Sequence, residues 1–207
     1  MTEKDQRQEE DDDEYVVCKV VLVGEASVGK TSIINRYVNG KFEEKYQATM
    51  CGGKLEKTDA ENKVKFSIWD TLGQEKYRSL AKEFYREADV CVIVYDVTNE
   101  NSFESVQNYW FNDVKDSAPK DAILCLVGNK TDLFEVQRVE EEKARKLAED
   151  NEAIFCLTSA KNDSGIKDLF KKIAEKIEEQ GKQGNQGKIK LEDNKDNKGE
   201  VKSKKCC

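Results

Sequence analysis

The chain has 207 residues, of which 42 are acidic and 35 are basic, so its formal net charge at pH 7 is −7. It contains 7 cysteines, 1 proline and no histidine, and the lack of histidine excludes Ser-His-Asp triads, Cys-His pairs and histidine-bound zinc or haem. No apolar run approaches the roughly 20 residues of a membrane-spanning helix, and the acidic start lacks the features of a signal peptide. We therefore expect a soluble, intracellular protein.

Charge divides the chain into three parts. Residues 1–14 carry eight acidic and two basic side chains, whereas residues 180–207 carry four acidic and eight basic ones. Both ends have too few large apolar side chains to offset the entropy lost on ordering. We predict an acidic, disordered extension over 1–14, one folded domain over 15–179 and a flexible tail over 180–207. The extension is either a solvated tail or a partner-binding or autoinhibitory segment, and the lack of a basic stripe in the domain argues against nucleic acid as a ligand.

Within residues 15–179, short apolar runs alternate with helical patterns. Most runs are nearly continuous and rich in β-branched residues, as in strands buried on both faces of a sheet. Residues 63–69 instead alternate, as an antiparallel or edge strand does, with Val64, Phe66 and Ile68 on one face. In chain order the patterns predict a strand at 16–23, a helix at 31–38, strands at 63–69 and 90–95, a helix at 103–117, a strand at 123–127, a helix at 140–150, a strand at 154–157 and an amphipathic helix over 166–177. This alternation predicts an α/β fold with helices on both faces of the sheet.

The segment after the first predicted strand matches the pattern GxxxxGK[ST], and we call it the phosphate loop (residues 24–31). Glycines let successive backbone N–H groups face an anion, and the next helix points its positive N-terminus at the same place. Lys30 can reach the β and γ phosphates of a nucleotide, and the Thr31 hydroxyl can bind Mg²⁺. A glycine-rich turn alone often marks only a tight connection, but the preceding strand and the Lys-Thr pair favour a phosphate site. The predicted nucleotide-binding residues here are Gly24, Glu25, Ala26, Ser27, Val28, Gly29, Lys30, Thr31 and Ser32.

Asp70 ends the alternating strand, and Gly73 follows three residues later. A carboxylate at a strand end can hold Mg²⁺ through water, although a lone aspartate here is more often a cap. The backbone N–H of Gly73 can approach a terminal phosphate. Together with the phosphate loop, Asp70 predicts a magnesium ligand.

Two further loops follow predicted strands: the Asn129 loop (residues 129–132) and the Ser159 loop (residues 158–161). The Asp132 carboxylate can accept hydrogen bonds from guanine N1–H and its 2-amino group, a donor pair that adenine lacks. Asn129 can fix its loop and reach N7, and the backbone N–H of Ala160 can donate to O6. Each loop alone is typical of an ordinary turn, but together at the carboxyl ends of strands they predict a guanine nucleotide site. The residues assigned to it are Asn129, Lys130, Asp132, Ser159, Ala160 and Lys161.

These four motifs resemble those of the Ras superfamily of small GTPases over about residues 15–179, and the chain is most similar to the Rab family. The resemblance implies the P-loop fold of small G-proteins, with a six-stranded, mostly parallel sheet and helices on both faces. It also implies Mg²⁺ as cofactor and GTP or GDP as ligand. The similarity to the Rab family rests on Trp69-Asp70-Thr71, Tyr77-Arg78-Ser79-Leu80, Phe84-Tyr85-Arg86, Val94-Tyr95-Asp96-Val97-Thr98 and Cys206-Cys207.

The resemblance also implies roles in two switch segments. Phe42 would flank the guanine ring, and the Thr49 hydroxyl would bind Mg²⁺ together with Thr31 and Asp70. Gln74 would orient the attacking water, while Lys30 would neutralise phosphate charge in the reaction. GTP would tether Thr49 and Gly73, and hydrolysis, slow without an activating protein, would release both segments.

Partners and location follow from the same resemblance. It implies an exchange factor, a GTPase-activating protein, effectors, a Rab escort protein and a GDP-dissociation inhibitor acting on a monomer. Cys206 and Cys207 would carry geranylgeranyl groups, because two lipid chains anchor a protein stably, although two unmodified thiols are the alternative. The protein would cycle between the cytoplasm and the cytosolic face of an intracellular membrane in vesicle trafficking.

Three departures from the family pattern leave alternatives open. Met50-Cys51-Gly52-Gly53-Lys54 stands where the family usually has Ile-Gly-Val-(Asp/Glu)-Phe, Leu72 stands where it usually has alanine, and Ala26 replaces a common glycine. The first two motivate a second hypothesis, a hydrolysis-deficient, nucleotide-locked Rab-like binding scaffold. An ATP-using P-loop kinase is a third class, which the Asn129 loop disfavours. Four cysteines lie in or beside predicted strands, where we expect small buried side chains in a reducing cytosol: Cys18, Cys91, Cys125 and Cys156.

Overall fold

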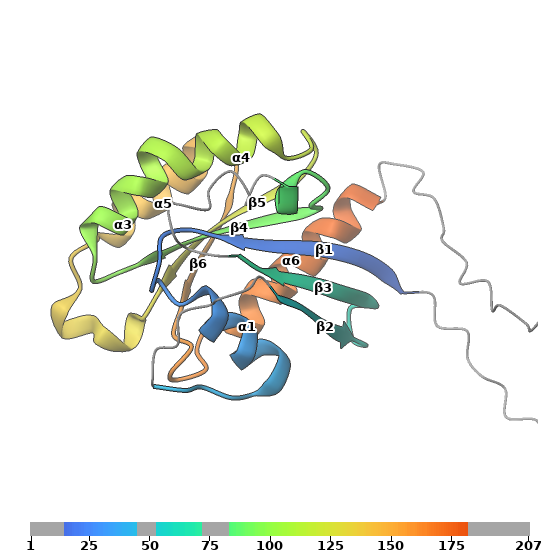
Figure 1. The fold of residues 1–207 in the computed structure, drawn as a ribbon, viewed down its shortest axis with the longest axis horizontal. Coiled ribbons are helices and arrows are strands. Elements are labelled where there is room, and N and C mark those ends of the chain that lie inside the picture. The colour runs from blue at the N-terminus through green and yellow to red at the C-terminus, as the bar shows by residue number, and fades with distance from the viewer. Residues whose placement is uncertain (1–14, 45–52, 72–82, 182–207) are drawn as a thin grey trace, which may run out of the picture.

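The computed structural model describes residues 15–44, 53–71 and 83–181. Within these ranges it contains a six-stranded sheet with the strand order β2-β3-β1-β4-β5-β6 (Figure 1). The strands are β1 (Val16–Val23), β2 (Gly53–Asp59), β3 (Val64–Asp70), β4 (Val90–Asp96), β5 (Ile123–Asn129) and β6 (Ile154–Thr158). The helices are α1 (Lys30–Asn39), α3 (Glu100–Ser105), the π-helix η2 (Val106–Trp110), α4 (Phe111–Ser117), the 3-10 helix η3 (Thr131–Val136), α5 (Glu141–Asp150) and α6 (Ile166–Gly181). The predicted α/β fold with a mostly parallel sheet is confirmed.

Strand register brings the predicted motifs to one edge of the sheet. β1 pairs in parallel with β3 and places Leu22 opposite Asp70. β5 lies between β4 and β6, and Asn129 is the partner of Asp96 on one side and of Thr158 on the other. The carboxyl ends of these parallel strands therefore carry Asp70, Asn129 and Thr158 along one edge of the sheet, with Asn129 directly beside Thr158.

The continuous apolar strands are explained by a core on each face of the sheet. In β1, Val20 and Leu22 pack on the face covered by α1 and α6, whereas Val21 and Val23 pack on the face covered by α3, η2, α4 and α5. In Figure 1, α3, α4 and α5 lie on one side of the sheet and α1 lies on the other. Because both faces are covered, a strand such as β4, buried at every position, needs no alternation of polar and apolar residues.

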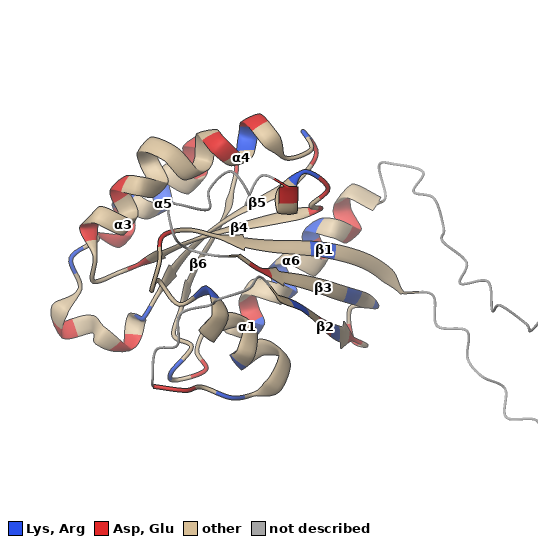
Figure 2. Cartoon of the chain, viewed as in Figure 1, with Lys and Arg blue, Asp and Glu red and all other residues tan. Residues whose placement is uncertain are grey.

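The alternating strand, predicted at residues 63–69, is β3, and its antiparallel partner is β2. β3 is not an edge strand, however, because it also pairs with β1. The edge is β2, a strand that the residue pattern did not predict because it is mostly polar. Two of its charged residues, Lys54 and Glu56, form an ion pair at 2.8 Å, and Glu56 also lies 3.2 Å from Lys65. Figure 2 colours charged positions along β2, and charged residues are the usual protection of an exposed sheet edge.

Two helix boundaries differ from the prediction by more than one residue. The helix predicted at 103–117 begins at Glu100, because the Asn99 side chain caps it by accepting from the Ser102 N–H at 3.3 Å. Its middle turn is the π-helix η2, in which one residue is inserted into the α-helical repeat. α6 continues to Gly181, two residues into the predicted tail, and Gln180 Nε2 donates to the Asp121 carbonyl oxygen at 3.3 Å.

The four strand cysteines are buried and reduced, as expected. Burial raises the pKa of Cys91 to about 12, so the thiol stays protonated at neutral pH. In the described part of the chain, no helix combines the length and apolar character needed to cross a membrane.

Candidate functional site

The phosphate loop runs from β1 into α1 and depends on two glycines. Gly24 has a φ of +137°, and a Cβ there would lie 2.2 Å from the Val94 carbonyl oxygen of β4. Gly29 has a φ of +98°, and a Cβ there would lie 2.3 Å from Asn129 Nδ2. The loop therefore fits closely against β4 and the Asn129 loop only because both positions lack a side chain.

Lys30 begins α1 and folds back over the phosphate loop. Its Nζ donates to the carbonyl oxygens of Gly24 at 2.9 Å and of Glu25 at 2.8 Å, and its side chain is buried. Burial lowers its pKa from 10.5 to about 8, a shift that nearby Asp70 and Glu25 oppose. An ammonium group held in this way faces the place where the loop would receive an anion.

The proposed magnesium ligands meet where β3 ends beside α1. Thr31 Oγ1 donates to Asp70 Oδ2 at 2.6 Å, although the two residues are 39 positions apart. Thr71 Oγ1 donates to the Leu22 carbonyl oxygen at 2.5 Å and fixes the end of β3 against β1. A hydroxyl and a carboxylate oxygen are hard ligands of the kind that Mg²⁺ prefers, so Thr31 and Asp70 fit this cation.

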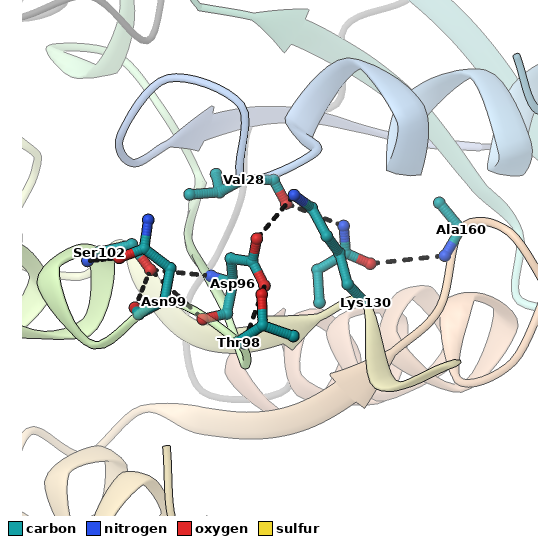
Figure 3. A network of polar contacts seen from close by, with 8 residues as sticks. Val28, Asp96, Thr98, Asn99, Ser102, Lys130 and Ala160 are labelled. Carbon is teal, nitrogen blue, oxygen red and sulfur yellow. Dashed lines mark hydrogen bonds and ion pairs between the residues drawn. The ribbon is translucent and has the colours of Figure 1, made fainter. Parts of the chain in front are cut away.

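Asn129 joins three of the four motifs. Its Nδ2 donates to the Val28 carbonyl oxygen of the phosphate loop at 2.9 Å. Its Oδ1 accepts from Thr158 Oγ1 at 3.2 Å and from the Ala160 N–H at 3.4 Å, both in the Ser159 loop. Two of these partners, Val28 and Ala160, are labelled in Figure 3. Asn129 is buried, and its contacts fix the relative position of the phosphate loop and the Ser159 loop.

Lys130 is held by Asp96, a residue that sequence reasoning did not assign to the site. Lys130 has a φ of +71°, and its Nζ lies 2.6 Å from Asp96 Oδ2 (Figure 3). The other carboxylate oxygen of Asp96 accepts from the N–H and the hydroxyl of Thr98 at 2.9 and 2.8 Å. The sequence pattern that could have indicated Asp96 is an aspartate at the end of a buried strand with a threonine two residues later. This pattern is also typical of an ordinary turn, so it did not identify Asp96 as a site residue.

Asp132 and the Ser159 loop are joined directly. Ser159 Oγ donates to Asp132 Oδ1 at 2.6 Å, and the same hydroxyl accepts from the Asn162 N–H at 3.1 Å. Ser159 is fully buried, whereas Asp132 is partly exposed. The carboxylate predicted to recognise guanine is thus fixed in direction while part of it faces solvent.

Arg36 is a second residue that sequence reasoning missed. From the last turn of α1, its Nε donates to the Ala160 carbonyl oxygen at 2.8 Å, and its Nη2 donates to that of Lys161 at 3.0 Å. Its guanidinium carbon lies 6.0 Å from the centre of the Phe42 ring, within cation–π range. Lys161 Nζ also lies 3.1 Å from Glu44 Oε1. Arg36 therefore ties the Ser159 loop to α1 and places Phe42 near it.

Several predicted residues lie outside the described part of the chain. Among the site residues, these are Thr49, Gly73 and Gln74, together with Leu72 beside them. The predicted lipid sites, Cys206 and Cys207, also lie outside it.

An α/β sheet with a phosphate loop, a Thr-Asp pair and an Asn129-centred pair of loops at one edge defines a P-loop nucleotide-binding protein. Residues 19–179 match the family model described as the Ras family. This match covers more than half of the chain, so the chain belongs to the Ras family. Membership supports the general class of small GTPase switches, which bind GTP or GDP with Mg²⁺ and act with exchange factors, activating proteins and effectors.

Proposed function

We propose that this protein is a Rab-type GTPase that recruits effectors to an intracellular membrane in vesicle trafficking and hydrolyses GTP slowly without an activating protein. The observation that carries its guanine-nucleotide chemistry is the position of Asn129. Its amide contacts the phosphate loop on one side and the Ser159 loop on the other, 2.9 Å from the Val28 carbonyl oxygen and 3.4 Å from the Ala160 nitrogen. One side chain therefore sets the spacing between the phosphates and the base.

In this proposal each described residue has a defined task. Lys30 Nζ exchanges its carbonyl partners for β and γ phosphate oxygens, and the N–H groups of the phosphate loop hold the same phosphates. Thr31 and Asp70 would hold Mg²⁺, which would supply positive charge to neutralise the phosphates. Asp132 accepts from guanine N1–H and the 2-amino group, and the Ala160 N–H donates to O6.

The remaining tasks fall on residues outside the described ranges. Thr49 and Gly73 contact the γ-phosphate and report its presence, and Gln74 orients the attacking water. Cys206 and Cys207 carry two lipids, which a transferase attaches with the help of a Rab escort protein and which a GDP-dissociation inhibitor later covers. Support for these tasks comes from the sequence motifs and from membership of the Ras family.

Single-turnover hydrolysis of GTP by the purified full chain tests the catalytic proposal. We expect slow release of phosphate that Gln74→Leu reduces further and that Leu72→Ala leaves unchanged. GTP that stays bound and intact in the wild type, with hydrolysis appearing only in Leu72→Ala, would support the nucleotide-locked scaffold instead.

Membrane recruitment is tested separately in cells by fractionation of the tagged protein. We expect Cys206→Ser combined with Cys207→Ser to move it from the membrane to the soluble fraction, because both lipids are lost. Ser203→Ala is the matched control, since it changes the same tail and keeps both cysteines. Membrane association that persists without the two cysteines contradicts this part of the proposal.

A further inference from the structure

Trp110 connects the phosphate loop to the π-helix η2. Its indole Nε1 donates to Glu25 Oε1 at 3.2 Å, across 85 positions of the sequence. Trp110 is the last residue of η2, and it is buried in the core on the face of the sheet covered by α3, α4 and α5. A π-turn shifts every later side chain around the helix axis by one residue. The direction in which this indole points therefore depends on the inserted residue.

Glu25 is the one acidic residue in the phosphate loop, residues 24–31. Its backbone oxygen lies 2.8 Å from Lys30 Nζ, and its charge is one of the influences that raise the pKa of Lys30 against burial. If it turned toward the loop, the Glu25 carboxylate would compete with phosphate for the Lys30 ammonium group and would repel the phosphate itself. The indole N–H is an uncharged donor that holds this carboxylate toward η2.

We infer that Trp110 is a positioning residue for nucleotide binding: it keeps the Glu25 carboxylate turned toward η2, and this slows nucleotide release. The inference rests on the proposed guanine-nucleotide site. A buried tryptophan commonly finds some partner for its N–H, so packing alone would explain a contact. The partner here is the single carboxylate of the phosphate loop. A positioning role therefore predicts that Trp110→Phe speeds nucleotide release only when position 25 is charged. A packing role predicts that the effect of Trp110→Phe does not depend on that charge.

The test is the rate at which the full chain releases a fluorescent GDP analogue, measured after addition of excess GDP. We expect Trp110→Phe to speed release about tenfold, the factor that corresponds to one lost hydrogen bond to a charged group. Glu25→Gln keeps an acceptor oxygen without the charge, and it serves as the uncharged background against which Trp110→Phe is compared. In the Glu25→Gln background, Trp110→Phe changes release less than twofold. An equal effect of Trp110→Phe in both backgrounds overturns the inference.

A second pair of variants leaves the core intact, in case Trp110→Phe does not fold. Glu25→Asp keeps the charge but is one methylene shorter, so the carboxylate does not reach the indole, and we expect release to speed up as in Trp110→Phe. Equal rates for Glu25→Asp and Glu25→Gln overturn the inference. Phe111→Leu is the control for packing, because Phe111 is buried beside Trp110 and carries no polar group; we expect no change in release. A wild type that binds no GDP overturns the proposed function itself, which is a different result from equal rates among variants that bind it.

Discussion

Replacing Asn129 with alanine removes the side chain that joins the phosphate loop to the Ser159 loop. Three hydrogen bonds are lost, at 2.9 Å to Val28, 3.2 Å to Thr158 and 3.4 Å to Ala160. Each such bond contributes about 1 kcal/mol, and unpaired groups that stay buried add to the cost. We therefore expect Asn129→Ala to lower the free energy of unfolding by about 3 kcal/mol. Because the two loops lose their spacing, the Kd for GDP should also rise about 100-fold, which corresponds to about 2.7 kcal/mol.

Urea denaturation without added nucleotide and equilibrium titration with GDP measure these two quantities separately, because bound GDP would itself add to the apparent stability. Thr158→Val is the matched control, because Thr158 is fully buried and shares only the 3.2 Å bond with Asn129. It should cost about 1 kcal/mol of stability and raise the Kd for GDP less than tenfold. If Asn129→Ala costs no more than Thr158→Val in both measurements, Asn129 does not set the spacing of the two loops.

The remaining predictions concern single residues of the site. Since burial lowers the pKa of Lys30 to about 8 and bound phosphate favours its charged form, the Kd for GDP should rise as the pH increases through about 8; a Kd that is constant between pH 7 and 9 contradicts this. Arg36→Ala should speed GDP release about tenfold, because the Ala160 carbonyl loses the 2.8 Å bond, and stopped-flow release that matches wild type contradicts it. Gly24→Ala should abolish GDP binding in a titration, because its Cβ would lie 2.2 Å from the Val94 carbonyl oxygen, and a wild-type Kd would refute that.

Much of the fold was predictable because its signals are local. The apolar run of β1 and the amphipathic spacing of α6 identify their elements without knowledge of any partner. Strand β2 was not predictable from its residues, because it is mostly polar and its charges are neutralised by cross-strand neighbours such as Lys65. The π-turn in η2 was hidden because one inserted residue barely disturbs an apolar pattern with a repeat of 3.6 residues.

The site divides in the same way. Gly24, Gly29 and Lys30 were predictable, since a continuous segment of eight residues holds the whole phosphate loop. Arg36 was not predictable, because its partner Ala160 is 124 positions away. The acceptor is also a backbone oxygen, which any residue type at position 160 would supply. The Trp110–Glu25 contact was not predictable for a related reason. The two residues are 85 positions apart in the sequence, and only the folded chain brings them together.

Competition between GDP and ADP for the fluorescent GDP analogue shows whether the Asn129 loop and the Ser159 loop form a guanine-specific site. Two hydrogen bonds from guanine to the Asp132 carboxylate are absent with adenine. GDP should therefore displace the analogue at a concentration more than about 100-fold below that of ADP. Asp132→Ala should reduce this preference to within about tenfold, because the carboxylate held by Ser159 at 2.6 Å is removed. Equal competition by the two nucleotides, or a preference for ADP, would contradict the account.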